Sequence, residues 1–483
     1  MERISNRFAL WLAIGRILSM LVSFAMPLIL TRVLVQSDYG VFSQFFTLYM
    51  AFFVIFGLGF HSNLFYFYPT ADENARDEYV SNTFFLLMTM SVVAVGVLSI
   101  PFMRDLLFGK GALREYSMLI VISIALAVPT NMISPLLTVR EDKVGAVFYP
   151  PIAAILRVGA VVIAALIKNN LTVVFWALII YQALIFLWIL IYSFKNHRVR
   201  FSKKKLWPQV MYSIPFGLSV AIQLFTHYFD KIASIRFLDT VEYAIYATAF
   251  LSIPGINQIY ESLCQVNVVN MSKGYQEGNL CQVRELYRDF VVKTLSFSTP
   301  VILAVSLFAE EVIGFLYPNE YIEAAYFFRI YSLTFLTAML GAGTILRAIG
   351  KTQYSLVSYA VAALIGVPAT YFLVKTYGIH GAIWGAVINM VLPRVMQMFY
   401  EAWQTESTIL NYLDWKNIGF VLGWGVLFLA PLLAFKLVFH PSIWICILLS
   451  GLYVIVTYLV YVKKGLFLLS RETINRALRN LKR

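Results

Sequence analysis

Long apolar runs separated by short polar segments make up most of this chain. A membrane-spanning helix needs about 20 mainly apolar residues, and the sequence contains about fourteen such runs. They lie near 8–31, 41–62, 83–103, 116–138, 146–167, 173–194, 211–238, 241–268, 292–309, 325–346, 353–374, 380–400, 417–438 and 442–462. The pattern predicts an all-α integral membrane protein with both termini on one side of the membrane.

The composition excludes water-soluble classes of protein. Of the 483 residues, 60% are hydrophobic and only 13% are charged, whereas about a quarter of the residues are charged in soluble domains. The chain also lacks the polar linkers that would separate soluble domains. We therefore exclude soluble enzymes and nucleic-acid-binding proteins, despite the net charge of +13.

The distribution of Lys and Arg predicts the orientation. Connections on the N-terminal side of the membrane contain 25 of these residues, and connections on the opposite side contain 9. Because basic loops remain in the cytoplasm, we expect a multi-pass protein of the cytoplasmic (inner) membrane with both termini in the cytoplasm.

The chain contains a weak internal repeat. Residues 31–42 align with 235–246 at an offset of 204, with Arg, Leu, an acid, Tyr and an aromatic residue in register. A weaker match relates 107–110 to 316–319 at an offset of 209. The repeat spans six helices, so the two halves share one orientation and are related by a pseudo-twofold axis along the membrane normal.

This repeat predicts the domain organisation. In transporters built in this way the substrate site lies between two bundles, and alternating access rocks one bundle against the other. The predicted parts are an N-terminal six-helix bundle at 1–194, a basic cytoplasmic linker at 195–210, a C-terminal six-helix bundle at 211–401, two additional transmembrane helices at 402–462 and a basic amphipathic cytoplasmic tail at 463–483.

Polar side chains that share one helical face predict a cationic central cavity. An ionised side chain in hydrocarbon costs at least about 2.5–3.5 kcal/mol, so such residues usually face a bundle interior or a wet cavity. The candidates on the first, seventh and eighth spans are Arg16, Ser19, Ser23, Gln223, His227, Asp230, Lys231, Ser234, Asn257, Gln258, Glu261 and Gln265. On the twelfth span, Arg394 and Gln397 are secondary candidates.

Local pairing is the alternative explanation for these charges. Arg157 and Arg329 lie alone in other spans, and for them we favour a structural role. The local partnerships to be weighed are Asp230 with Lys231 or His227, Arg394 with Glu401, and Arg16 with the inner membrane interface.

Motifs for catalysis or metal binding are missing from the sequence. It contains no His-Glu-x-x-His, no Gly-x-Ser-x-Gly and no paired-cysteine spacing. The outer loops have about 15 residues or fewer, which is short for a catalytic loop. We expect neither an enzyme nor a metal or other cofactor. Asp230, Glu261 and His227 are candidates for coupling to H⁺ or Na⁺.

Four stretches together resemble a known family. They are Leu30-Thr31-Arg32 through Asp38-Tyr39-Gly40, Ser213-Ile214-Pro215 through Asp230-Lys231, Glu242-Tyr243 through Tyr246, and Tyr377-Gly378-Ile379-His380-Gly381-Ala382. In this order they resemble the polysaccharide transporter family of the multidrug/oligosaccharidyl-lipid/polysaccharide (MOP) exporter superfamily, especially Wzx-type O-antigen and capsule-repeat flippases.

The resemblance implies a MATE-like fold of two bundles around a central cavity. The implied activity moves a polyprenyl-pyrophosphate-linked oligosaccharide, such as an O-antigen, capsule or exopolysaccharide repeat unit, from the inner to the outer leaflet. Arg16 and Lys231 are the positions that match basic residues thought to engage the anionic headgroup. Other implied partners are membrane lipids, a polysaccharide polymerase and the chain-length machinery, with no nucleic acid.

Two rival functions follow from the same sequence. One is an ion-coupled multidrug or toxin antiporter of the same superfamily, which usually has a cation-binding acid in the first span, where this chain has Arg16. The other is a membrane glycosyltransferase or ligase, which the short outer loops disfavour.

Overall fold

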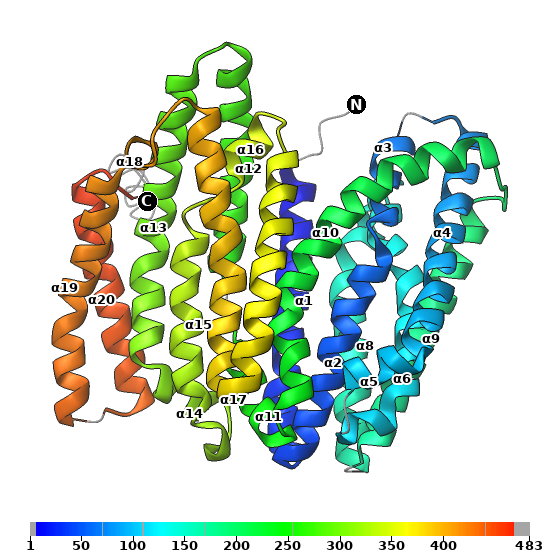
Figure 1. The fold of residues 1–483 in the computed structure, drawn as a ribbon, viewed down its shortest axis with the longest axis horizontal. Helices are drawn as coiled ribbons and strands as arrows, with labels where there is room; N and C mark the ends of the chain where they lie inside the picture. The colour runs from blue at the N-terminus through cyan, green and yellow to red at the C-terminus, as the bar shows by residue number, and fades with distance from the viewer. Residues whose placement is uncertain are drawn as a thin grey trace, which may run out of the picture. The chain divides into compact units, whose positions relative to one another are not determined.

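The computed structural model describes residues 6–69, 71–108, 111–168, 170–253, 255–439 and 441–467. For 6–14, 16, 215, 216, 219 and 262, it describes the backbone alone. Most of the predicted tail at 463–483 therefore lies outside the described residues. Throughout the described ranges the chain is helical and without β-strands (Figure 1), which confirms the predicted all-α class.

The helices form two compact units, Met1–Ala247 and Thr248–Arg483. The helices of unit 1 are α1 (Asn6–Val33), α2 (Gln36–Gly57), η1 (Phe60–Ser62), α3 (Asn63–Phe67), α4 (Glu73–Ser99), α5 (Pro101–Phe108), η2 (Ala112–Tyr116), α6 (Ser117–Ala127), η3 (Val128–Met132), α7 (Ile133–Val139), α8 (Lys143–Ile167), α9 (Leu171–Asn196), α10 (Lys203–Phe237) and α11 (Thr240–Ala249), whose last two residues lie beyond the boundary.

The helices of unit 2 include the longest element of the chain. They are α12 (Ile256–Gln276), α13 (Leu280–Leu307), α14 (Ala309–Leu316), η4 (Asn319–Tyr321), α15 (Ala324–Ala338), α16 (Thr344–Ala348), α17 (Gln353–Gln404), α18 (Ile409–Tyr412), α19 (Trp415–Phe439) and α20 (Ile443–Lys463). Within the described ranges, nine helices are long and apolar enough to cross a membrane. The count of about fourteen stays a prediction.

In unit 1, α10 lies alongside α2 (Figure 1) and also packs against α4. A Cβ at Gly217 of α10 would lie 1.9 Å from the Leu58 carbonyl oxygen, and a Cβ at Gly40 of α2 would lie 1.8 Å from the Thr240 carbonyl oxygen. Only glycine permits such close backbone approach. The sequence places 211–238 at the start of the second bundle, whereas these contacts group α10 with the first unit.

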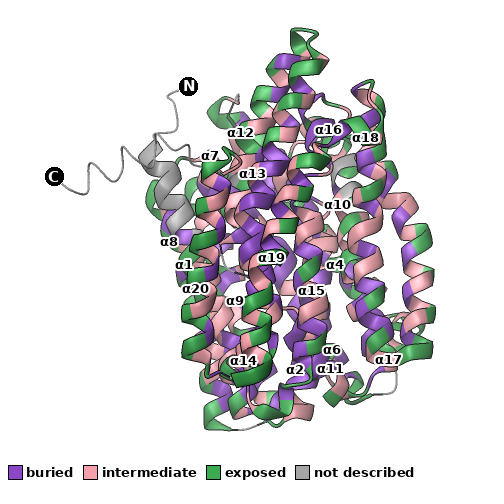
Figure 2. Ribbon diagram, turned by 90° about the vertical axis from the view of Figure 1, so that its left-hand side faces the viewer, coloured by how far each residue is buried: buried purple, intermediate pink, exposed green. Residues whose placement is uncertain are grey.

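In unit 2, α13 is the central helix. It packs against α12, α15, α19 and α20, and buried positions run along it in Figure 2. By contrast, α19 and α20 expose large apolar side chains such as Val426, Leu437 and Leu448. Apolar side chains that the unit leaves uncovered are suited to contact with lipid.

The long helix α17 is a hairpin of two helices. Gly378 has non-helical backbone angles (φ 56°, ψ −133°) and marks the kink. A Cβ at Gly381 would lie 1.9 Å from the Leu373 carbonyl oxygen, and one at Gly385 would lie 2.5 Å from the side chain of Thr370. These glycines let the two arms pack closely, as small residues four apart predict.

Helix boundaries recur along the chain at a nearly constant offset. The corner between Val33 of α1 and Gln36 of α2 is repeated 204 residues later, between Phe237 of α10 and Thr240 of α11. The eight-residue helices α5 and α14 begin 208 residues apart, and each follows a long helix. Helix boundaries thus recur where the sequence repeat predicts them, and the division into two six-helix bundles with two additional helices stays a prediction.

Candidate functional site

Arg157 lies deep within α8, which packs along α1. It is 14 residues from the first residue of α8 and 10 from the last, or about 21 Å and 15 Å along the helix axis. Its Nη2 donates a hydrogen bond to Ser23 Oγ on α1 at 3.0 Å, and its guanidinium carbon lies 5.7 Å from the centre of the Phe46 ring. These contacts hold a cation far from either end of a membrane-spanning helix.

A cavity of about 180 Å³ adjoins Arg157 inside unit 1. Gln182 Nε2 donates a hydrogen bond to the Tyr49 hydroxyl oxygen, so the Tyr49 proton can be donated to another group. The cavity therefore offers hydrogen-bond donors within the spanning helices. The polar residues of its wall are Ser19, Tyr49, Thr130, Tyr149, Arg157, Tyr181 and Gln182.

No acidic side chain neutralises Arg157 in the part of the chain that the structure describes. Its Nε is buried and has no hydrogen-bond partner there. The sequence favours a structural role for this residue because its own span is apolar. Its partner Ser23 is 134 residues away, so local spacing could not reveal the contact. The signal that the sequence does offer is the position of a single arginine within an otherwise apolar span.

A second polar cluster of unit 1 surrounds Asp230 on α10. This carboxylate is buried, with 1% of the residue exposed. Its Oδ2 accepts a hydrogen bond from the Tyr246 hydroxyl at 2.5 Å and lies 3.3 Å from Lys231 Nζ. Ser234 Oγ donates to the Asp230 carbonyl oxygen at 2.6 Å. The predicted local pair with Lys231 is present, and Tyr246 was not foreseen as its partner.

The other candidate residues on α10 and α12 differ in how far their side chains are exposed. Gln223 and His227 are exposed, unlike buried Ser234. Half-buried Gln258 accepts a hydrogen bond through Oε1 from the Gly255 backbone N–H at 3.1 Å and so caps α12. The exposed candidates of α12 are Asn257, Glu261 and Gln265.

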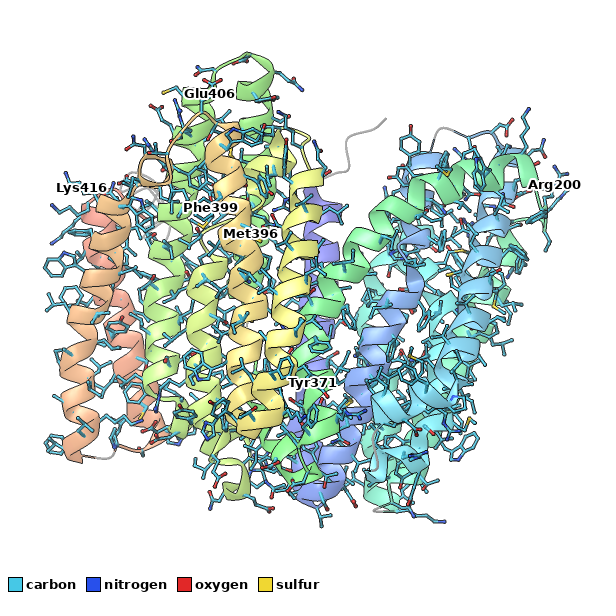
Figure 3. The ribbon with its side chains drawn as sticks, in the orientation of Figure 1. Arg200, Tyr371, Met396, Phe399, Glu406 and Lys416 are labelled. Atoms are coloured by element: carbon cyan, nitrogen blue, oxygen red, sulfur yellow. The ribbon has the colours of Figure 1, made fainter. Side chains whose placement is uncertain are left out.

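The secondary candidates lie on one face of the second arm of α17. Arg394 Nη1 donates to Thr337 Oγ1 on α15 at 2.7 Å. Gln397 is only 3% exposed, whereas Phe399, labelled in Figure 3, is 58% exposed. Gln397 therefore lies on the buried face of this arm, together with apolar residues such as Met398 and Ala402.

Arg394 does not pair with Glu401. The buried Glu401 carboxylate instead accepts hydrogen bonds from the Ile345 backbone N–H at 2.7 Å and from the Tyr412 hydroxyl. The proposed Arg394–Glu401 pair is therefore wrong, because the start of α16 and the Tyr412 hydroxyl already occupy this carboxylate.

The two other arginines that the sequence singles out are Arg329 and Arg16. Arg329 pairs with Glu310, with Nη2 and Oε1 3.1 Å apart, which confirms its local structural role. The side chain of Arg16 lies outside the described residues. Of the predicted residues, the structure thus places Ser19 in the wall of the Arg157 cavity and Ser23 against Arg157 itself, and gathers Asp230, Lys231 and Ser234 into a separate cluster. That residues of unit 1 meet those of α12 in one cavity stays a prediction.

Within the described ranges, no group of three or more His, Cys, Asp or Glu side chains is placed to hold a metal ion. The site therefore consists of hydroxyl, amide and charged groups inside a helical bundle.

Comparison with known proteins identifies the family. The family model described as "Polysaccharide biosynthesis protein" matches residues 7–268, more than half of the chain. The chain belongs to this family. The match includes α1, α8 and α10, and therefore both polar clusters of unit 1. Among curated proteins, none matches this sequence.

Solved structures of the MOP superfamily share the fold of this polysaccharide biosynthesis family member. The lipid II flippase MurJ, in an inward closed conformation, has a TM-score of 0.73 at 12% identity, over 94% of this chain and 99% of that one. An inward-facing multidrug resistance MATE family transporter has a TM-score of 0.59 at 14% identity, over 82% of this chain and 94% of that one.

A MOP superfamily transporter from Pyrococcus furiosus has a TM-score of 0.55 at 14% identity, over 83% of this chain and 95% of that one. At such identities the likeness establishes the fold alone. The predicted MATE-like fold and the predicted membership of a MOP-type polysaccharide family are both confirmed.

Proposed function

We propose that this protein is a flippase that moves a polyprenyl-pyrophosphate-linked oligosaccharide from the inner to the outer leaflet. The family and the fold are those of membrane transport proteins, not enzymes. The observation that supports the proposal most is the uncompensated Arg157 guanidinium beside a hydroxyl-lined cavity, deep within spanning helices.

The chemistry of this substrate explains why such a site is useful. A pyrophosphate glycan presents anionic oxygens and many hydroxyls, and each unpaired polar group costs several kcal/mol in hydrocarbon. Unassisted crossing is therefore negligible. The guanidinium of Arg157 complements phosphate oxygens, and the hydroxyls of Tyr49, Tyr149 and Tyr181 can bond to sugars.

Alternating access through a cationic central cavity is part of this proposal. A cavity of about 180 Å³ suits a phosphate-sized group, not a whole oligosaccharide, so the glycan needs a wider path between the predicted bundles. Arg16 and Lys231 are the proposed further cations on that path. The polyprenyl tail stays in lipid while the headgroup crosses.

The test is genetic complementation of a deletion strain. We expect Arg157→Gln, Arg16→Ala and Lys231→Ala each to reduce surface glycan about tenfold or more, the cost of one charge-assisted contact. The lipid-linked precursor should accumulate on the inner leaflet. Lys168→Gln, which removes an exposed cation just after α8, is the control. Normal glycan in all three variants at normal expression would reject the cationic path.

We further propose coupling to H⁺ or Na⁺, with Asp230, Glu261 and His227 as candidates. Asp230 is the strongest of these because its Oδ1 is buried and has no hydrogen-bond partner among the described residues. Transport in proteoliposomes should then depend on one of the two ion gradients and lose that dependence in Asp230→Asn. Transport that is indifferent to both gradients would remove the coupling and leave the flippase proposal intact.

The MATE-like fold makes an antiporter for cationic drugs the second candidate. The positive charge of Arg157 disfavours a cationic substrate in this cavity. Expression of the protein in a drug-sensitive strain should therefore leave resistance to cationic dyes unchanged, whereas raised resistance would favour the antiporter.

A further inference from the structure

A polar pocket of about 530 Å³ lies at the end of unit 1 where α3 ends, α4 begins and α9 ends. This volume falls within the range of about 300–1,000 Å³ that is typical of ligand sites. The pocket is separate from the Arg157 cavity and shares no wall residue with it. Its ionisable residues are Glu73, Arg76, Asp77, Arg140, Lys195, His197 and Arg198.

Two arginines of the pocket are held in place by aromatic rings. The Arg76 guanidinium lies 5.1 Å from the centre of the Tyr68 ring, and its Nε donates to the Tyr68 carbonyl oxygen at 3.3 Å. Arg140 lies 5.0 Å from the centre of the Tyr192 ring, and its Nη2 donates to Asn196 Oδ1 at 2.9 Å. Both cations are therefore oriented before any ligand arrives.

The pocket has unused capacity to bind an anion. Arg140 Nη1 is buried without a hydrogen-bond partner in the described part of the chain, and Lys195 and Arg198 are exposed. The pocket contains two carboxylates, those of Glu73 and Asp77. The Asp77 carboxylate already contacts His197, with 3.0 Å between Asp77 Oδ1 and His197 Nδ1. Four permanent cations thus face two carboxylates, which leaves an excess of positive charge.

Apolar side chains flank this charged pocket. Phe65 and Tyr66 of α3 are 50% and 61% exposed, and Val199 and Phe201, just after α9, are 72% and 56% exposed. Arg200, labelled at the same end of unit 1 in Figure 3, donates to Asn74 Oδ1. Apolar and aromatic residues beside a basic pocket at a helix end are typical of a membrane interface.

We propose that this pocket binds the phosphate-bearing headgroup of an anionic phospholipid of the inner leaflet. Arg140 and Arg76 contact the phosphate, Lys195 and Arg198 add attraction at the rim, and the flanking apolar residues contact the acyl chains. The proposal depends on the predicted cytoplasmic orientation of this end but not on the transported substrate. The bound lipid would anchor α4 and α9 at the interface.

The test is native mass spectrometry of the purified full-length protein with a short-chain phosphatidylglycerol, with phosphatidylcholine of equal chain length for comparison. We expect phosphatidylglycerol to bind preferentially. Since each basic residue near an anionic surface contributes about 1 kcal/mol, Arg140→Gln and Lys195→Gln should each weaken its binding about fivefold. Exposed Lys195 provides a variant that leaves the fold intact.

Arg114→Gln is the matched control because it removes one cation at the opposite end of α4, where Arg114 pairs with Asp105 at 2.7 Å. It should bind phosphatidylglycerol as the native protein does. Equal binding by the native protein and both pocket variants would overturn the proposal. Inorganic pyrophosphate is the soluble probe. If it binds as tightly as the lipid, and if Arg140→Gln and Lys195→Gln weaken its binding to the same extent, the pocket takes a soluble phosphate and the lipid assignment is wrong.

Discussion

At the scale of single residues, the polar groups inside this protein depend on partners distant in sequence. Arg157 is placed by Ser23 of another helix, and the Asp230 carboxylate accepts a hydrogen bond from Tyr246 across a helix corner. A buried polar group without a partner costs about 1–3 kcal/mol. Arg157 Nε and Asp230 Oδ1 are buried without a hydrogen-bond partner among the described residues, and such atoms lower the stability of the fold unless a ligand or a solvent molecule satisfies them.

His197, which follows α9 directly, provides a prediction about pH. Burial lowers its pKa below the ordinary value of 6.5; its hydrogen bond with Asp77 opposes this shift, and the charges of Arg140 and Arg76 reinforce it. Its Nε2 also lies 3.4 Å from the Tyr68 hydroxyl. The unfolded chain then binds the proton more tightly, so the stability from neutral His197 is present above about pH 6.5 and is lost as the pH falls.

Thermal unfolding in detergent measures this effect. Between about pH 7.5 and about pH 5.5, we expect the native protein to lose a few °C more in Tm than His197→Asn. Arg198→Gln, which changes an exposed neighbour, should keep the native pH dependence. The same loss of Tm in the native protein and in His197→Asn would contradict the assignment.

At the scale of helices, close backbone contacts determine which elements pack together. Gly40 of α2 contacts the Thr240 carbonyl at the start of α11, and the Tyr243 hydroxyl donates to Thr47 Oγ1 at 2.9 Å. Residues 31–42 and 235–246, which the sequence repeat relates, thus form equivalent helix corners that lie against each other within unit 1.

The substitution Gly40→Ala tests this contact. Its new Cβ would lie 1.8 Å from a backbone oxygen, so the helices must separate, and overpacking of this kind costs about 1–3 kcal/mol. We expect a lower Tm and less protein in the membrane. Gly96→Ala in α4 is the control, because nothing lies within 4 Å of its Cβ, and helix propensity favours Ala by about 1 kcal/mol. An unchanged Tm for Gly40→Ala would disprove the close contact.

Much of the helical pattern could be predicted from the sequence, because apolar runs and repeated corners are local signals. The kink at Gly378 falls between two predicted spans, and the corner at Val33 recurs at Phe237 with the predicted offset of 204. The packing of α10 with α2 could not be predicted, because it depends on the close approach of Gly217 to Leu58. The contact of Arg157 with Ser23 could not be predicted either, because the two residues are 134 positions apart.

At the scale of the whole molecule, the chain is a membrane protein with large apolar side chains on its helix surfaces. Trp444, Leu448 and Leu459 of α20 are each more than half exposed, which would cause aggregation in water but suits a lipid environment. Orientation in that environment is predicted from the Lys and Arg distribution alone.

The cysteines allow a direct test of orientation. Cys281 is exposed at the start of α13, whereas Cys264 and Cys446 are buried. A membrane-impermeant maleimide should label Cys281 in inverted membrane vesicles and leave intact cells unlabelled. Cys281→Ser should abolish the signal. Labelling of Cys281 in intact cells would reverse the predicted topology.

The grouping of α10 with the preceding helices has a consequence for biosynthesis. The first unit extends to Ala247. The surface of α2 against which α10 packs therefore stays uncovered during synthesis until α10 has left the ribosome. Chains interrupted at 195–210 would lack this partner and become substrates for quality-control proteolysis. A gene divided after Ala249, where α11 ends near the unit boundary, should instead encode two fragments that each keep their own core, and co-expression of these halves should restore the assembled protein.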